Sequence, residues 1–207
     1  MDADPVEIRV LGCLLEKQRT TPDQYPLSLN ALRLAANQAT NRDPVVDYDE
    51  HTIRTALDKL GRRGWTRLTS GPGSRVAKFR HLLDEALTVT QSQLALLAVL
   101  MLRGPQTVGE LRTRSERLYA FASIDDVEFA LAELSHRELV ECLPRRPGER
   151  EERWVQLLGG ERTGSFEAAA HEAAADSERP DLAERVARIE QQLAELLERL
   201  DLPDSPE

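Results

Sequence analysis

Cysteine is scarce in this sequence, and long apolar runs are missing. Only two cysteines occur among 207 residues, Cys13 and Cys142, and they are far apart in the chain. Two isolated cysteines do not make the framework of a disulfide-rich secreted protein, so we expect a reduced, cytoplasmic protein. The longest apolar run covers residues 94–102, which is about half of the length that a membrane span requires. We therefore expect no membrane-spanning segment.

A secretory signal is also missing from the N-terminus. Such a signal needs a basic start followed by an apolar core. The chain instead begins with Asp2, Asp4 and Glu7. We therefore expect no export.

The motifs of the common enzyme classes are missing as well. The histidines are scattered, no pair of cysteines has the spacing of a metal site, and no nucleophile motif or phosphate-binding loop occurs. Gly71 and Gly73 belong to an expected hairpin tip, because no helix follows them to receive a phosphate. The sequence therefore predicts no catalytic activity, no metal, no cofactor and no small-molecule ligand.

The net charge argues against nucleic acid, but the distribution of charge does not. The formal net charge is −9. Residues 1–88 hold 13 basic and 12 acidic groups, whereas residues 159–207 hold 5 basic and 13 acidic groups. Within residues 54–80, eight arginines and lysines stand against Asp58 alone. Such a local excess determines the attraction to phosphate more than the net charge does.

A sequence pattern that predicts a helix followed by a strand occurs twice, 74 positions apart, in residues 49–68 and 123–143. Both copies place apolar residues at the i, i+3, i+4, i+7 spacing of a helix that packs on a small core. The matching pairs are Ile53 and Val127, Ala56 and Ala130, Leu57 and Leu131, Leu60 and Leu134, and Trp65 and Leu139. A duplication of about 70 residues predicts two small domains.

The two copies differ in what their helices show to solvent. At about 100° per residue, the outward face of the first helix carries His51, Thr55, Asp58, Lys59 and Arg62, flanked by Arg54 and Arg63. The equivalent face of the second helix carries Asp125, Phe129, Ala132, Glu133 and His136. The first face is basic and polar, whereas the second is acidic with an aromatic.

The order of the predicted elements indicates the fold class. In a first domain, residues 1–88, we expect three helices, near residues 6–17, 29–36 and 50–61, and then a hairpin around residues 71–73. In a second domain, residues 89–158, we expect helices near 91–102, 108–117 and 125–137 and strands near 139–143 and 153–158. Ser28 and Asp49 are suitable N-caps. We therefore predict a mainly α protein with small β-hairpins, made of two tandem winged helix-turn-helix domains plus a C-terminal helix.

The tail is expected to contain a flexible linker, residues 159–180, and a helix, residues 181–201. The helix has an apolar seam at the spacing of a coiled coil, made of Leu182, Val186, Ile189, Leu193, Leu196 and Leu200. Two interpretations stay open. The helix pairs between chains, or it packs back on its own domains, since short coiled coils are marginal alone.

The segment TTPDQYPLSLNALRLAANQATNRDPV, residues 20–45, is the most specific part of the sequence. With SRVAKFRH and LPRRPGEREERW further along, it closely resembles the YceH-like family of uncharacterised bacterial proteins. The resemblance covers nearly all of residues 8–158 and implies a tandem winged-helix fold. Members of that family typically have a Cys and a Lys where this chain has Ala36 and Ala39.

We hypothesise that the basic helix and hairpin of the first domain bind double-stranded DNA, as in a transcriptional regulator. Arginine and lysine read guanine or contact phosphates, and a glycine-rich hairpin tip lets the backbone approach DNA closely. The candidate DNA-binding residues are Asn41, Arg42, His51, Arg54, Thr55, Lys59, Arg62, Arg63, Arg75, Lys78 and Arg80. The alternative is a solvated helix face with an Arg54–Asp58 pair, beside a charged hairpin that resists aggregation.

The polar residues around Tyr25, Asn37 and Gln38 have either a structural or a binding role. Their amides and hydroxyls satisfy loop backbone groups, and we prefer this structural role to a ligand or DNA contact. Asn41 and Arg42 are the members that we expect to contact phosphate, because their loop precedes the basic helix.

A scaffold for other proteins is the alternative function, from a different class. Phe129 and Ala132 between acidic residues suit a protein contact better than a phosphate. Together with the apolar seam of the C-terminal helix, they are the candidate residues of a protein interface, and a homodimer is one arrangement of it.

Overall fold

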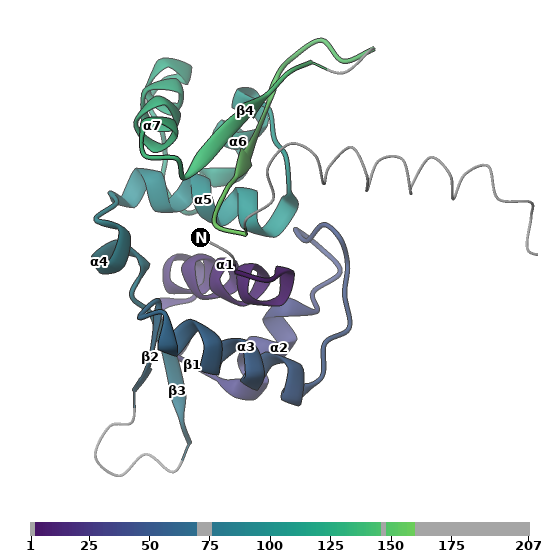
Figure 1. Cartoon of the computed structure of the whole chain (residues 1–207), viewed down its shortest axis with the longest axis vertical. Helices are drawn as coiled ribbons and strands as arrows, with labels where there is room; N and C mark the ends of the chain where they lie inside the picture. The colour runs from purple at the N-terminus through teal and green to yellow at the C-terminus, as the bar shows by residue number, and fades with distance from the viewer. Residues whose placement is uncertain (1–2, 70–75, 146–147, 160–207) are drawn as a thin grey trace, which may run out of the picture. The chain divides into compact units, whose positions relative to one another are not determined.

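The computed structural model describes residues 3–69, 76–145 and 148–159. These residues form seven α-helices and two small antiparallel sheets (Figure 1). They belong to one compact unit of the chain, Met1–Arg162. The predicted helix 181–201 with its six seam residues, nearly all of the predicted linker and the candidate residue Arg75 lie outside the described residues.

Two stretches of the chain contain the same succession of elements. We call residues 5–81 the N-terminal repeat and residues 91–156 the C-terminal repeat. The N-terminal repeat contains α1 (Pro5–Thr20), the 3-10 helix η1 (Pro22–Gln24), β1 (Leu27–Ser28), α2 (Leu29–Ala36), α3 (Glu50–Arg62), β2 (Thr66–Thr69) and β3 (Lys78–His81). The C-terminal repeat contains α5 (Gln91–Arg103), α6 (Val108–Ser115), α7 (Ile124–His136), β4 (Val140–Leu143) and β5 (Arg153–Gln156). The short helix α4 (Leu83–Leu87) connects them.

The strands are paired in the same way in both repeats. In the N-terminal repeat the strand order is β1-β3-β2, with Leu27 opposite Phe79. In the C-terminal repeat β4 pairs with β5, and Gln106, two residues before the start of α6, makes an isolated bridge with Trp154. This bridge stands where β1 stands in the first repeat, since each precedes the second helix and pairs with the last strand. The two repeats therefore share strand connectivity as well as helix order.

Most of the predicted elements are confirmed, and their ends differ by a few residues. Ser28 and Asp49 are N-caps of α2 and α3, as predicted. α1 extends to Thr20, beyond the expected end near residue 17. The 3-10 helix, β1 and α4 were not predicted, because two to five residues are too few to show a periodic pattern.

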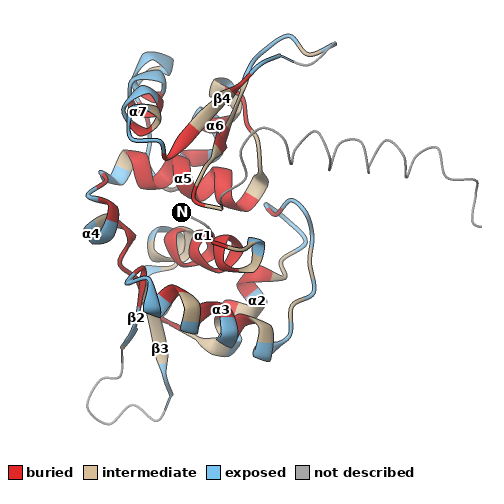
Figure 2. Ribbon diagram, in the orientation of Figure 1, coloured by how far each residue is buried: buried red, intermediate tan, exposed pale blue. Residues whose placement is uncertain are grey.

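The two innermost helices are α1 and α5, which lie between the outer elements of the two repeats (Figures 1 and 2). Residues 7–15 of α1 and residues 93–102 of α5 are all buried. A helix that is buried on every side has neighbours on every side. Each of these helices packs on its own repeat with one face and on the other repeat with the opposite face, so that one hydrophobic core runs through both.

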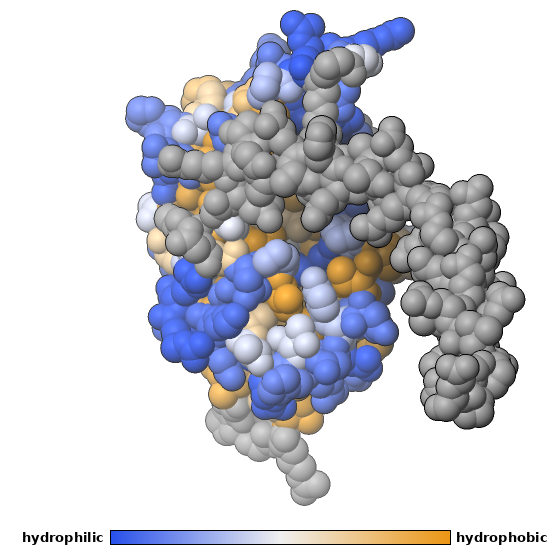
Figure 3. All heavy atoms as spheres, turned by 45° about the vertical axis from the view of Figure 1, so that its right-hand side comes forward, coloured by the Kyte–Doolittle hydropathy of each residue, from blue (hydrophilic) through white to orange (hydrophobic). Residues whose placement is uncertain are grey.

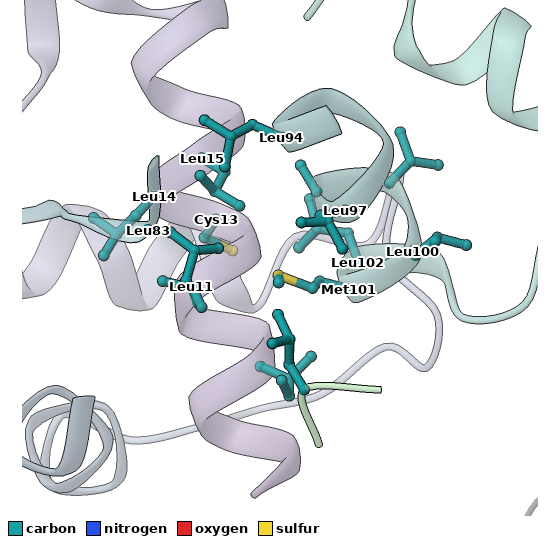
Figure 4. Close-up of a cluster of buried hydrophobic side chains, with 14 of the residues drawn as sticks. Leu11, Cys13, Leu14, Leu15, Leu83, Leu94, Leu97, Leu100, Met101 and Leu102 are labelled. Atoms are coloured by element: carbon teal, nitrogen blue, oxygen red, sulfur yellow. The ribbon is translucent and has the colours of Figure 1, made fainter. Parts of the chain in front are cut away.

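Gly12 of α1 lies against the end of α5. A Cβ atom at this position would lie 3.0 Å from Leu102 Cδ2 and 3.0 Å from Met101 Cβ. Figure 4 shows the side chains of Leu11, Leu15, Leu97 and Met101 between α1 and α5. The absence of a side chain at Gly12 therefore lets the two helices meet.

Backbone hydrogen bonds add to this contact at both ends of the interface. The Ala3 N–H donates to the Leu158 carbonyl at 3.1 Å, and the Asp43 N–H donates to the Leu102 carbonyl at 2.8 Å. The second bond ties the long loop between α2 and α3 to the end of α5. Among the described residues, no helix combines the length and apolar character needed to cross a membrane.

Replacing Gly12 by leucine is expected to destabilise the protein. The new side chain has no room between the helices, and overpacking of a core costs about 1–3 kcal/mol. For a domain of this size, that loss lowers the melting temperature by about 2–12 °C. The measurement is thermal unfolding followed by circular dichroism.

Gly61→Leu is the matched control. Gly61 also lies in a helix, but a Cβ atom there meets nothing within 4 Å, so the control is expected to keep or slightly raise the melting temperature. Equal melting temperatures for the two variants would show that Gly12 does not set the spacing of the repeats.

Candidate nucleic-acid interface

The helix α3 is held in the N-terminal repeat by one apolar stripe. Its N-cap is Asp49, whose Oδ1 accepts a hydrogen bond from the Thr52 N–H at 2.7 Å. The predicted apolar residues are all buried: Ile53, Ala56, Leu57, Leu60 and, beyond the helix, Trp65. The prediction of this stripe is confirmed. Its burial fixes which side of α3 faces away from the core.

The side of α3 away from the core is polar and open to solvent. The exposed residues are His51, Arg54, Thr55, Asp58 and Arg62. Figure 3 shows hydrophilic residues over much of the lower half of the visible face, where the N-terminal repeat lies in Figure 1. Arg54 and Asp58 are one turn apart, yet no ion pair joins them, and within the described ranges Arg62 has none either. Two guanidinium groups on α3 are therefore free to meet an anion.

Lys59 and Arg63 have carboxylate partners at the start of α1. Asp4 and Glu7 form a capping box, in which one oxygen of each accepts the backbone N–H of the other at 2.9 Å. The remaining oxygens bind α3: Asp4 Oδ2 lies 2.7 Å from Lys59 Nζ, and Glu7 Oε1 lies 3.1 Å from Arg63 Nε. The two carboxylates therefore cap one helix and hold the end of another.

The ion pairs shift the ionisation of their members. Burial acts to raise the pKa of Asp4, but the hydrogen bonds from Lys59 and from the Glu7 N–H outweigh it and lower that pKa. The same hydrogen bond and the charge of Asp4 raise the pKa of Lys59. A phosphate group that binds Lys59 must therefore displace an ionised carboxylate.

The hairpin adds cations next to α3. Arg67 on β2 stands directly opposite Arg80 on β3, and Thr69 stands opposite Lys78. Residues opposite each other in an antiparallel pair lie on the same face, so Arg67, Lys78 and Arg80 share one face of the hairpin. Arg80 lies 3.6 Å from Glu85, whereas in the described part of the chain Arg67 and Lys78 have no ion pair.

The base of the hairpin is anchored by buried polar groups. The His81 side chain is buried, its Nε2 lies 2.7 Å from Gln18 Oε1, and its Nδ1 accepts the Leu83 N–H at 3.3 Å. The phenol oxygen of Tyr25 accepts the His81 backbone N–H at 2.8 Å. Burial lowers the pKa of His81, which favours the neutral imidazole that this arrangement needs. The position of the hairpin relative to α1 is therefore fixed.

The loop between α2 and α3 is held by its own polar side chains, as the structural interpretation predicts. Asn37 pairs with the backbone of Tyr48 through its Nδ2 and Oδ1, at 2.8 and 2.9 Å. Arg42 has no exposed side-chain surface and binds Glu16 through Nη1 and Nη2, at 3.1 and 2.6 Å. Asn41 accepts a hydrogen bond from Arg103 of α5. Arg42 holds the loop in place and has no surface with which to contact a phosphate.

The equivalent helix of the C-terminal repeat, α7, has a different exposed face. Its apolar stripe is buried, as predicted, and Asp125, Phe129, Ala132, Glu133 and His136 are exposed. The Phe129 side chain is 67% exposed, more than any other large apolar residue among those described. Such a face is poorly suited to phosphates.

Metal ligation and the ionisation of cysteine bear on what chemistry is open to the described residues. Among them, no group of three or more His, Cys, Asp or Glu residues is placed to hold a metal ion. Burial raises the pKa of the Cys13 thiol to about 11. Burial and a hydrogen bond with Glu152 raise the pKa of Cys142 to about 11. Both thiols are therefore protonated at neutral pH, whereas a nucleophilic cysteine needs a lowered pKa.

Three partners of the candidate residues were not found from the sequence. Asp4, Glu7 and Glu16 lie 26 to 56 positions from the cations that they bind. The spacing of Asp4 and Glu7 signals a capping box, but nothing local signals their second role. Arg67 contributes to the local charge excess in the sequence, and only the strand register places it on the same face as Lys78 and Arg80.

Comparisons with known proteins show the family. Residues 3–149 match the family described as "Protein of unknown function, DUF480". A UPF0502 protein of Citrifermentans bemidjiense is 50% identical over 196 residues, which cover 92% of this chain and 88% of that protein. A UPF0502 protein of Shewanella loihica is 48% identical over 198 residues and 92% of each chain. A UPF0502 protein of Geotalea uraniireducens is 53% identical over 163 residues, or 78% of this chain and 74% of that protein.

The chain belongs to this UPF0502 (DUF480) family of uncharacterised bacterial proteins. The predicted membership of a YceH-like family is thereby confirmed. The description of the family names no activity.

Glu16→Gln is expected to destabilise the protein at neutral pH and much less in acid. The variant leaves the buried Arg42 charge without its partner, which costs about 3 kcal/mol. Burial acts to raise the pKa of Glu16, but hydrogen bonds from Arg42 and its charge lower it below the ordinary value of 4.5. The ion pair therefore stabilises the folded protein above about pH 4.5, and its contribution is lost as the pH falls further. Urea unfolding at pH 7 and pH 3.5 measures the difference from the original chain.

The matched control for this measurement is Glu128→Gln, which alters an exposed carboxylate on α7. Its free energy of unfolding is expected to stay within about 0.5 kcal/mol of the original chain. If the Glu16→Gln difference is the same at both pH values, the carboxylate of Glu16 is not what holds the loop.

Proposed function

We propose that this protein binds double-stranded DNA through the N-terminal repeat, as a winged-helix regulator without catalytic activity. In this proposal α3 enters the major groove, and the hairpin β2–β3 contacts the flanking backbone. The observation that carries it is the set of four cations that lack a carboxylate partner among the described residues: Arg54, Arg62, Arg67 and Lys78.

The succession of elements supports the winged-helix assignment. Each repeat has a helix, a short strand or bridge, two more helices and a two-stranded hairpin. The loop between α2 and α3, residues 37–49, is longer than the three or four residues of a simple helix-turn-helix. The bond from Asp43 to Leu102 and the Arg42–Glu16 pair hold this loop, so α3 keeps a fixed direction in spite of the longer connection.

The electrostatics of the hairpin also support a polyanionic partner. Arg67 and Arg80 face each other across the ladder, and like charges in this position are destabilising by a few tenths of a kcal/mol or more. Phosphate groups that bind between them relieve this repulsion. Because phosphate contacts dominate the affinity for DNA, such an arrangement favours DNA over an uncharged partner.

The direct test is the salt dependence of binding to a mixed-sequence duplex, followed by fluorescence anisotropy with the full chain. If four phosphates are neutralised, the logarithm of the association constant falls with the logarithm of salt with a slope of about 3.6. The double variant Arg54→Ala with Arg62→Ala is expected to reduce that slope by about 2 and to weaken binding of every sequence.

The control for this test is Arg145→Ala with Arg150→Ala, which removes two exposed arginines from the hairpin of the C-terminal repeat. The control is expected to leave the slope within about 0.5 of the original chain. Absence of binding at micromolar protein and low salt, or equal slopes for the two double variants, would remove the proposal.

The carboxylate of Asp4 is expected to weaken binding by occupying Lys59. Asn is as good an N-cap as Asp, so Asp4→Asn keeps the cap of α1 and removes the competing charge. We expect tighter DNA binding at low salt and a slope that is larger by about 0.9, because Lys59 then contributes one phosphate contact. The measurement is the same anisotropy titration.

Asp2→Asn is the matched control for Asp4→Asn, because it also removes one negative charge at the N-terminal end of the chain. An equal gain in the two variants would mean that general repulsion, and not the release of Lys59, limits binding.

A protein-interaction scaffold is the second candidate, and the observation that favours it is the exposed Phe129 on the acidic face of α7. A partner or a second copy that covers this ring gains apolar burial. Phe129→Ala is then expected to weaken self-association at least tenfold in sedimentation equilibrium. Leu68→Ala, which alters another exposed apolar residue, is the control. A monomer at all concentrations for the original chain removes self-association through this face.

A further inference from the structure

A pocket of about 320 Å³ opens between the two repeats, on the side of the loop that precedes α3. Its walls come from α1, from the end of α5 and from the end of α6. Pockets that hold small molecules start at about this volume. The floor is apolar, with Val99, Leu102 and Leu118, and the rim carries Arg103, Arg114 and Arg117.

The three arginines of this pocket differ in their carboxylate partners. Arg114 binds Glu110 at 3.2 Å. The Arg103 guanidinium donates a hydrogen bond to the amide oxygen of Asn41, and no carboxylate pairs with it among the described residues. Arg117 is exposed and has no ion pair within the same residues. Two guanidinium groups at one pocket are thus left without a counter-charge, apart from the exposed Glu116.

The surroundings of Arg103 are electrostatically unfavourable for a cation. Burial, and then the positive charges of Arg114 and Arg42, lower the pKa of Arg103. Glu16 also lines the pocket, but its carboxylate is used by Arg42. An anion that enters the pocket offsets the cost of this arrangement, and guanidinium groups bind carboxylate and phosphate with two parallel hydrogen bonds.

The other large pocket gives no comparable signal. It lies at α6, α7 and the second hairpin, where Arg145 and Arg150 meet Glu128, Glu151 and Glu152. Three carboxylates stand against two cations there, so this pocket does not favour an anion.

We propose that the pocket between the repeats binds a small organic anion, with a compact apolar body on the leucine and valine floor and a carboxylate or phosphate group at Arg103 and Arg117. The site does not depend on the proposed DNA binding. Asn41, at the rim, has a φ of 61°, a left-handed conformation that asparagine tolerates. Its side chain and the Asp43–Leu102 bond join the loop to the same part of α5. A bound anion therefore contacts Arg103, the α5 residue to which Asn41 ties the loop, and lies beside that loop.

The test is isothermal titration calorimetry of the full chain with benzoate and with phenyl phosphate. Inorganic phosphate and phenol serve as controls that each lack one half of the ligand. At least one of the two organic anions is expected to bind with a dissociation constant near 1 mM, which is ordinary for a ligand of about ten heavy atoms. The two controls are expected to bind at least tenfold more weakly.

The variants show where binding occurs. Arg103→Gln and Arg117→Gln are each expected to weaken binding about tenfold or more, the usual effect of losing a charged hydrogen bond. Arg112→Gln removes a neighbouring exposed arginine that does not line the pocket, and it is expected to leave binding unchanged. Arg117 is exposed, so its variant keeps the proposal testable if Arg103→Gln does not fold.

Several results would overturn the site. They are no heat with either organic anion at 10 mM, equal binding of inorganic phosphate or phenol, and binding that is unchanged in Arg117→Gln. These titrations test the anion site independently of the proposed DNA binding, because no nucleic acid is present in them.

Discussion

The two repeats are held together by the packing of α1 against α5. Each helix is the innermost element of its repeat, and each is buried on all sides because the other repeat covers the face that its own repeat leaves open. Gly12 allows the backbone to approach Leu102 and Met101. A repeat of this size buries a modest core alone, and joining two repeats through their central helices makes one larger core. The outer helices α3 and α7 are then free to present different surfaces on the same scaffold.

The polar contacts of the N-terminal repeat distinguish cations that stabilise the fold from cations that are available to a partner. Arg42, Lys59 and Arg63 bind Glu16, Asp4 and Glu7. These pairs position the loop before α3 and the end of α3 itself. Arg54, Arg62, Arg67 and Lys78 lie on the helix and hairpin that those pairs position, which is why we propose them as the residues that contact phosphate. In the proposed complex, one set of basic residues supplies the rigidity that the other set needs to meet a regular array of phosphates.

Local patterns in the sequence were sufficient for the six α-helices of eight residues or more and for the buried stripe of α3. Ile53, Ala56, Leu57 and Leu60 show the period of 3.6 over a full-length helix, and Asp49 marks its start. The two-residue strand β1 could not be predicted, because its only signal is a pairing with β3 about 50 positions away.

The candidate site was predictable in outline and not in its details. An arginine in a polar loop has the same local appearance whether it faces solvent or a buried glutamate, so Arg42 was expected to be accessible. The pairing of Lys59 with Asp4 spans 55 positions and depends on how α1 crosses α3. Such contacts between distant segments follow from the packing of helices, and the spacing of residues within one helix carries no information on them.

Nuclear magnetic resonance of the isotope-labelled chain can show directly which backbone amides respond to duplex DNA. The account predicts that signals of α3 and of the β2–β3 hairpin, including those of Arg54, Arg62, Arg67 and Lys78, shift together as duplex DNA is added, while signals around Phe129 on α7 stay in place. Shifts that centre on α7, or a spectrum that does not change at millimolar DNA, would contradict it.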